Sequence, residues 1–207
     1  LSYATGTQSV VDNTAPAGTI TQPSAGAVLR GTVSIASDWL DSHTPGSIQM
    51  RIDGGTWTSL AVWDTTVLAD GAHSLRLRCA DSLGNMGETD ARLVIVDNTQ
   101  PVGSVSAAAY TNIGTVTLNL SYHDATSQVV SANYSDGGSS WTGWAAPTAT
   151  YSLTLGSTGF RTIYYAIQDT AGNVSTLTTT ILYDGTPPQG TITINSGAAY
   201  TNSRFVT

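Results

Sequence analysis

The chain has 207 residues, only 10% of them charged, and a formal net charge of −7, with seven arginines and no lysine. This acidic balance excludes the basic surface that nucleic-acid phosphates require, and no polybasic segment is present to bind an anionic membrane. No apolar run approaches the roughly 20 residues that span a bilayer, so no membrane insertion is expected in this segment. Without lysine there is no lysine-based catalysis or isopeptide crosslink, and a single cysteine cannot form an internal disulfide.

Two short motifs recur along the chain at a period of 85 to 88 residues. An Asp-x-Thr-x-Pro motif begins at Asp12, Asp97 and Asp184, at spacings of 85 and then 87 residues. An Asp-x-x-Gly-Asn motif at 81–85 returns at 169–173, 88 residues on. A period of this size corresponds to one small β-sandwich domain.

The repeats predict two complete domains, at residues 13–97 and 98–184. Residues 1–12 are expected to be the last strand of a preceding domain. Residues 185–207 are expected to hold the first strands of a following, incomplete one, because so short a segment cannot bury a core. The sequence therefore predicts a piece of a longer array.

In the first repeat, apolar residues alternate with polar ones, which is typical of β-strands with one buried face. The alternation covers residues 33–35, 48–52 and 75–79. Turn sequences rich in Asp and Gly follow at 53–55 and 70–71.

The second repeat shows the same alternation at residues 116–122, 130–134 and 163–167. Cys79 in the first repeat matches Ile167 in the second, which predicts a small buried hydrophobic residue rather than a reactive thiol. About seven short strands per repeat, with no helical period, predict an all-β fold of tandem immunoglobulin-like Greek-key β-sandwiches.

Residues 134–144 (YSDGGSSWTGW) and 168–175 (QDTAGNVS) resemble bacterial immunoglobulin-like repeats of secreted and cell-surface proteins. The first repeat is similar to a sister group, through 63–66 (WDTT), 70–75 (DGAHSL) and the linker 96–101 (VDNTQP). The resemblance implies a structural spacer or stalk segment of an extracellular bacterial surface protein, adhesin or filament.

The partners implied are neighbouring immunoglobulin-like domains of the same chain and other copies in a fibre, to which residues 1–12 or 185–207 would lend a strand. Two alternatives stay open: a carbohydrate- or host-surface-binding adhesin module, and a non-catalytic accessory region of a larger exported enzyme. No catalytic residue and no enzyme activity is expected within this segment. It lacks a nucleophile elbow and a cofactor loop, and its three histidines lack zinc-ligand spacing.

Acidic residues gather at the predicted domain joints. In an immunoglobulin-like sandwich, the entering linker, the loop between the second and third strands and the last hairpin lie at one end. Calcium takes six to eight oxygen ligands, so these segments could hold an ion that stiffens the array, and no other cofactor is expected. The candidate ligands are Asp12, Asp38 or Asp41, and Asp81 at the first joint, and Asp97, Asp124 and Asp169 at the second.

Plain turn chemistry is the alternative, since an aspartate such as Asp81 or Asp169 closes an Asx-turn with its own side chain. Strict strand register also matches Asp38 with His123, and reaches Asp124 only through a one-residue shift.

Three tryptophans are candidates for stacking on a sugar ring: Trp39, Trp141 and Trp144. Trp39 is expected in a loop between Asp38 and Asp41, where it would be exposed. Covering a sheet face or the end of a core is the alternative role of all three.

Overall fold

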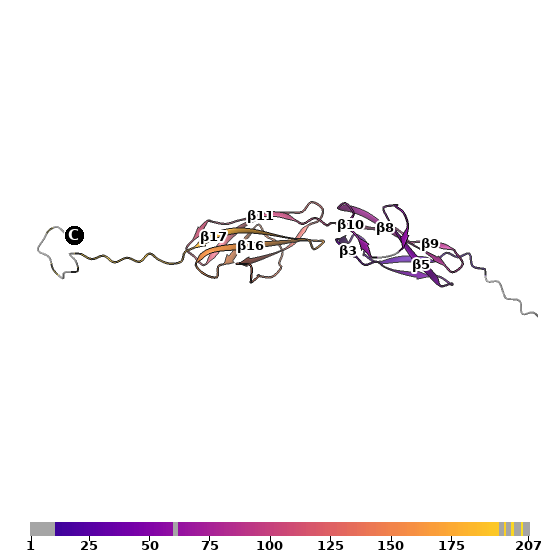
Figure 1. The fold of residues 1–207 in the computed structure, drawn as a ribbon, viewed down its shortest axis with the longest axis horizontal. Helices are drawn as coiled ribbons and strands as arrows, with labels where there is room; N and C mark the ends of the chain where they lie inside the picture. The colour runs from indigo at the N-terminus through magenta and orange to yellow at the C-terminus, as the bar shows by residue number, and fades with distance from the viewer. Residues whose placement is uncertain (1–10, 60–61, 195–196, 198–199, 201–203, 205–207) are drawn as a thin grey trace, which may run out of the picture.

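The computed structural model describes residues 11–59 and 62–194, together with residues 197, 200 and 204. Within this part of the chain, the strands form two β-sandwiches that lie end to end (Figure 1). No sheet contains strands from both sandwiches. The predicted all-β sandwich fold is confirmed.

The first sandwich is built from ten short strands. They are β1 (Ala17–Gln22), β2 (Val28–Leu29), β3 (Thr32–Val33), β4 (Ala36–Leu40), β5 (Pro45–Ile52), β6 (Thr58–Ser59), β7 (Trp63–Asp64), β8 (Gly71–Asp81), β9 (Met86–Glu88) and β10 (Arg92–Val96). One layer holds the pairs β1–β4 and β3–β7. The other has the order β2-β10-β8-β5-β6, with β9 also paired to β8.

The second sandwich has seven strands in two sheets. They are β11 (Val102–Ser106), β12 (Tyr110–Thr111), β13 (Thr115–His123), β14 (Val129–Asp136), β15 (Thr150–Thr154), β16 (Gly159–Asp169) and β17 (Val174–Tyr183). The sheet orders are β11-β13-β15 and β12-β17-β16-β14. In both sandwiches the chain crosses early from one sheet to the other, where β2 pairs in parallel with β10 and β12 with β17.

Each sandwich has its own hydrophobic core, formed by the side chains that alternate along each strand and point inward. Leu75, Leu77 and Val96 are completely buried in the first, and Leu118 and Tyr165 in the second. The two cores share no residue, so each sandwich buries its apolar surface independently. No helix in the described part of the chain is long and apolar enough to cross a membrane.

Cys79 and Ile167 are both completely buried at matching places in the two sandwiches. Each pairs with the neighbouring strand of its own sheet, Cys79 opposite Ile48 of β5 and Ile167 opposite Ala132 of β14. Burial raises the pKa of the Cys79 thiol, which keeps it protonated and unreactive.

The strict register that matched Asp38 with His123 is wrong. β1 pairs Ala17 with Leu40, and β11 pairs Val102 with His123, so Leu40 is the structural counterpart of His123. The next residues, Asp41 and Asp124, are therefore equivalent. The strand pairs decide this alignment.

The predicted strand fragment at 1–12 falls almost wholly outside the described residues. Residues 185–194 of the predicted third repeat form no strand and leave the second sandwich as extended chain (Figure 1). Most of the remaining C-terminal segment also lies outside the described residues.

Candidate functional site

The joint between the two sandwiches brings Asp97, Asp124 and Asp169 together from three separate segments. Asp97 follows β10, Asp124 follows β13 and Asp169 ends β16. One carboxylate oxygen of each lies within 4.8 Å of the others. These are the three residues that the sequence assigned to one cation at this joint.

Asp97 is completely buried, and its two carboxylate oxygens differ in their surroundings. Oδ1 accepts a hydrogen bond from the amide of Thr99 at 3.2 Å, whereas Oδ2 is buried with no hydrogen-bond partner in the described part of the chain. Burial is the main cause that raises the pKa of Asp97 above its usual range. The negative charges of Asp124 and Asp169 add to this effect, whereas the nearby Ser127 hydroxyl and the Thr99 amide oppose it. A bound cation would offset both the burial and the repulsion between the carboxylates.

Asp124 shows the same division between its two oxygens. Oδ1 accepts hydrogen bonds from the amides of Thr126 at 2.9 Å and Ser127 at 2.8 Å. Oδ2 is buried and, among the described residues, has no partner. This cluster therefore contains two buried carboxylate oxygens without donors, one from Asp97 and one from Asp124. Such an arrangement is costly unless a positive charge accompanies it.

Asn173 ties the linker to the last hairpin of the second sandwich. Its side-chain nitrogen donates to the backbone oxygen of Asp97 at 2.9 Å and to Asp169 Oδ2 at 2.8 Å. The backbone amide of Asn173 donates to Asp169 Oδ1 at 2.8 Å. The Asp-x-x-Gly-Asn motif thus acts as a clamp on the linker as well as closing its own turn.

The first sandwich holds the other end of the linker. Asn98 Oδ1 accepts from the amide of Gly31 at 2.9 Å, and Asn98 Nδ2 donates to the backbone oxygen of Thr65 at 3.0 Å. Arg30 Nε, beside β2, crosses the joint and donates to the backbone oxygen of Ala171 at 3.0 Å. Hydrogen bonds from both sandwiches therefore restrain this linker.

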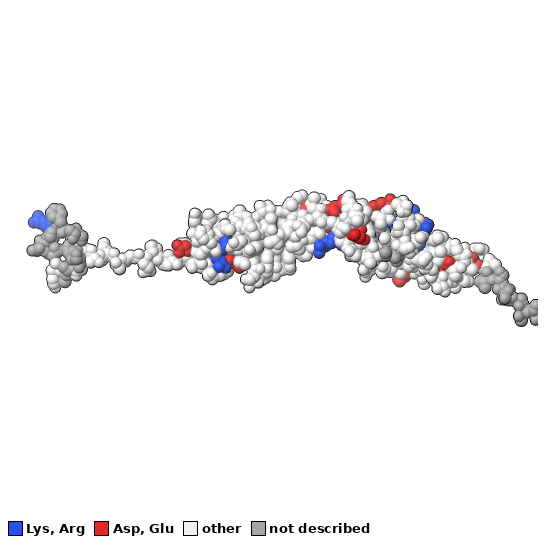
Figure 2. Space-filling view, in the orientation of Figure 1, with Lys and Arg blue, Asp and Glu red and all other residues white. Residues whose placement is uncertain are grey.

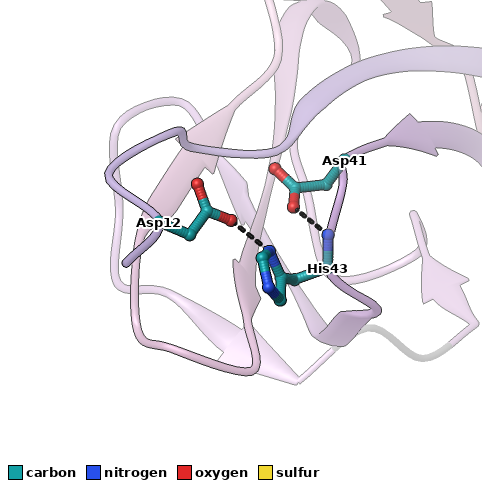
Figure 3. Close-up of side chains that lie close together, drawn as sticks. All are labelled: Asp12, Asp41 and His43. Atoms are coloured by element: carbon teal, nitrogen blue, oxygen red, sulfur yellow. Dashed lines mark hydrogen bonds and ion pairs between the residues drawn. The ribbon is translucent and has the colours of Figure 1, made fainter. Parts of the chain in front are cut away.

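The equivalent cluster before the first sandwich contains a histidine (Figure 3). Asp12, Asp41 and His43 have ligand atoms within 4.8 Å of one another. His43 Nδ1 makes a hydrogen-bonded contact with Asp12 Oδ2, and the His43 amide donates to Asp41 Oδ1 at 2.7 Å. An imidazole within the set departs from the all-oxygen sites that calcium prefers.

The sequence did not identify His43 as a candidate metal ligand, because the histidines lack zinc-ligand spacing along the chain. The only local signal was its position two residues after Asp41, where the second repeat has Thr126. Its contact with Asp12 depends on the fold, since the two residues lie 31 positions apart.

Asp81 and Asp38 stand outside this first cluster. Asp81 uses both oxygens in its own turn, accepting from the amide of Leu83 at 2.8 Å and from Asn85 Nδ2 at 2.7 Å. Burial acts to raise the pKa of Asp81, but these hydrogen bonds outweigh it and lower the pKa. Asp38 is an exposed residue of β4 opposite Thr19, so of the alternatives Asp38 and Asp41 only Asp41 lies at the joint.

The three candidate tryptophans occupy different environments. Trp39 belongs to β4 rather than to a loop, packs against the first core and donates from Nε1 to Ser37 Oγ at 3.1 Å. Its expected exposure in a loop is therefore corrected. Trp141 and Trp144 are 41% and 48% exposed.

No family model and no curated protein matches this sequence. Among solved structures, the chain is similar to the fibronectin(III)-like modules of CbhA from Clostridium thermocellum. The identity is 16%, with 81% of this chain and 94% of that chain covered and a TM-score of 0.53. It is also similar to the FN1–FN3 domains of chicken CNTN1, at 11% identity, 82% and 66% coverage and a TM-score of 0.50.

A structure from a 1.5-MDa bacterial ice-binding adhesin matches at 15% identity, 84% and 66% coverage and a TM-score of 0.46. The two similarities with TM-scores of 0.53 and 0.50 show the fold alone, a fibronectin-type β-sandwich.

Proposed function

We propose that this chain is a structural spacer segment of an extracellular bacterial surface protein or fibre, and that a calcium ion stiffens its central joint. The observation that carries the proposal is the fully buried Asp97, which has one unpartnered carboxylate oxygen and lies in a cluster with Asp124 and Asp169. No nucleophile, cofactor loop or catalytic role is assigned to this segment.

A spacer must keep its domains apart and limit how they bend. The linker of this chain is held by Asn98 on one side and by Asn173 on the other, with Arg30 and Ala171 in direct contact across the joint. Independent cores on either side allow length to be added without new chemistry. These features support a stiff, extended arrangement.

The central joint, between the two sandwiches, suits calcium. The three carboxylates supply oxygen ligands from the linker and from two loops of the second sandwich, and backbone oxygens and water would complete the coordination shell. Calcium sites of extracellular modules have dissociation constants of about 10⁻⁴–10⁻³ M, which matches the calcium available outside cells. The resemblance to bacterial surface repeats supports the same location.

The test compares the whole chain in excess calcium and in excess chelator, by thermal melting and small-angle scattering. At a calcium concentration about a hundredfold above the dissociation constant, binding adds about 2.7 kcal/mol and raises the melting midpoint of the second sandwich by roughly 10 °C or more. Scattering should report an extended particle that bends less in calcium than in chelator.

Two substitutions give the matched comparison. Asp97→Asn should abolish the calcium-induced shift, because it removes a charged ligand with little change in volume. Asp38→Asn, at an exposed position on β4 of the first sandwich, should leave the calcium-induced shift unchanged. An equal midpoint in calcium and chelator would reject the ion, and a folded-back particle in both conditions would reject the spacer.

A further inference from the structure

A pocket of about 390 Å³ opens on the second sandwich, beside the turn that follows β14. Residues 134–136 and 139–142 line it, together with residues from the end of β15, the loop that follows and the first part of β16. The volume falls within the range of about 300–1,000 Å³ that is typical of small-molecule sites. The joint and its carboxylates contribute no residue to it.

Trp141 supplies an aromatic wall whose position is fixed. Its backbone forms an isolated bridge with Ser135, and its ring lies 6.3 Å from the ring of Tyr164, tilted by 58°. Gly137 and Gly138 adopt φ values of 84° and 79°, which glycine tolerates at no steric cost, and so allow the tight turn before Trp141. Although it is held in this way, the indole remains 41% exposed.

Asp136 and Arg161 supply a polar part of the lining. Arg161 Nε donates to Asp136 Oδ1 at 2.8 Å, and the amide of Gly156 donates to Asp136 Oδ2 at 2.7 Å. Arg161 Nη1 donates to Ser157 Oγ at 2.9 Å, whereas Nη2 makes no hydrogen bond within the described residues. The pair therefore offers a free donor beside a carboxylate whose two oxygens each already accept one hydrogen bond.

The charge of the pocket selects against ionic ligands. Asp136 and Arg161 neutralise each other, and the remaining lining residues are uncharged. In the view of Figure 2, most of the surface of the second sandwich is likewise uncharged. A ligand with several hydroxyl groups suits this site, because each hydroxyl both donates and accepts.

We propose that this pocket binds a neutral saccharide, with one sugar ring stacked on Trp141 and its hydroxyl groups hydrogen-bonded to Asp136 and Arg161. Sugar rings carry an apolar C–H face and a polar edge, which is the combination that the pocket lining presents. A mono- or disaccharide unit matches the volume. This binding role goes beyond the spacer function and is independent of the joint.

Isothermal titration calorimetry of the whole chain with cellobiose, maltose, lactose and chitobiose tests the proposal, with sialyllactose as the charged comparison. At least one neutral disaccharide should bind. Trp141→Ala should then weaken binding about tenfold, because loss of a stacked aromatic ring costs roughly 1.4 kcal/mol. Arg161→Lys should also weaken binding, since it keeps the charge but loses the guanidinium geometry.

Trp144→Ala is the matched control, because Trp144 is similarly exposed but does not line the pocket. The affinity of the Trp144→Ala variant for the disaccharide should stay within about twofold of the wild-type affinity. Equal melting midpoints of the two variants would establish that the loss of binding is not a loss of fold. The proposal is overturned if none of the neutral disaccharides binds, if only sialyllactose binds, or if Trp141→Ala binds like the wild type.

Discussion

His73 and Asp53 show how single residues couple this fold to pH. His73 Nδ1 lies 2.5 Å from Asp53 Oδ2, and His73 Nε2 lies 2.8 Å from the backbone oxygen of Ala69. Both ring nitrogens face acceptors, so the doubly protonated imidazolium is favoured. The hydrogen bond to Asp53 is the main cause that raises the pKa of His73 above 6.5, against the opposing effect of burial.

A raised pKa in the folded state means that the folded chain binds this proton more tightly than the unfolded chain does. The His73 proton therefore contributes its full stabilisation below pH 6.5, where Asp53 is ionised, and this stabilisation is lost as the pH rises through the higher folded-state pKa of His73. Because Asp53 is 45% exposed, the effect should stay below about 1 kcal/mol.

Urea unfolding at a series of pH values on either side of neutrality measures this dependence. His73→Gln should flatten the curve of the first sandwich over that interval, with the wild type more stable only on the acidic side. If wild type and variant change in parallel, the His73–Asp53 pair does not contribute to the pH dependence.

At the scale of the strands, β9 depends on a glycine. Gly87 is buried and faces Cys79 across the β8–β9 pair. A Cβ atom at this position would lie 1.8 Å from the backbone oxygen of Pro16, which is far inside van der Waals contact. The segment before β1 can therefore pack against β9 only because residue 87 has no side chain.

Gly87→Ala should destabilise the first sandwich by about 3 kcal/mol, since the backbone must move to relieve the overlap. Gly190→Ala is the control, because a Cβ there meets no atom within 4 Å. Denaturant midpoints of both variants check the prediction, and a neutral Gly87→Ala would contradict the close approach of Pro16 and β9.

At the scale of the whole molecule, the separate cores make the sandwiches energetically independent. Leu118 is completely buried in the second core, which shares no residue with the first among the described residues. Leu118→Ala should cost about 2–5 kcal/mol in the second sandwich through lost burial and a residual cavity. The first sandwich should keep its own stability.

Calorimetry of the chain in chelator, where the joint couples the sandwiches least, separates the two transitions. The transition of the second sandwich should fall and that of the first should remain. If both transitions shifted together, the two sandwiches would instead form one cooperative unit.

The amino-acid sequence alone determined the repeat, the strand alternation and the fold class. These features are local, because side chains in a strand alternate between two faces and the same turn motifs recur at one period. They were sufficient to match Cys79 with Ile167 and to select Asp97, Asp124 and Asp169. They also identified Trp141 and Trp144 as candidate ligand-binding residues.

The tertiary structure alone decided which of these side chains meet. The pairing of β1 with β4 aligned Asp41 rather than Asp38 with Asp124, brought His43 to Asp12 and packed the partly buried Trp39 against the core. It also placed Arg161 beside Asp136 to form the pocket wall. Such contacts join residues far apart in the chain, and they depend on strand register. The alternating pattern alone does not fix the register, because a shift of two residues leaves the same side chains on the buried face.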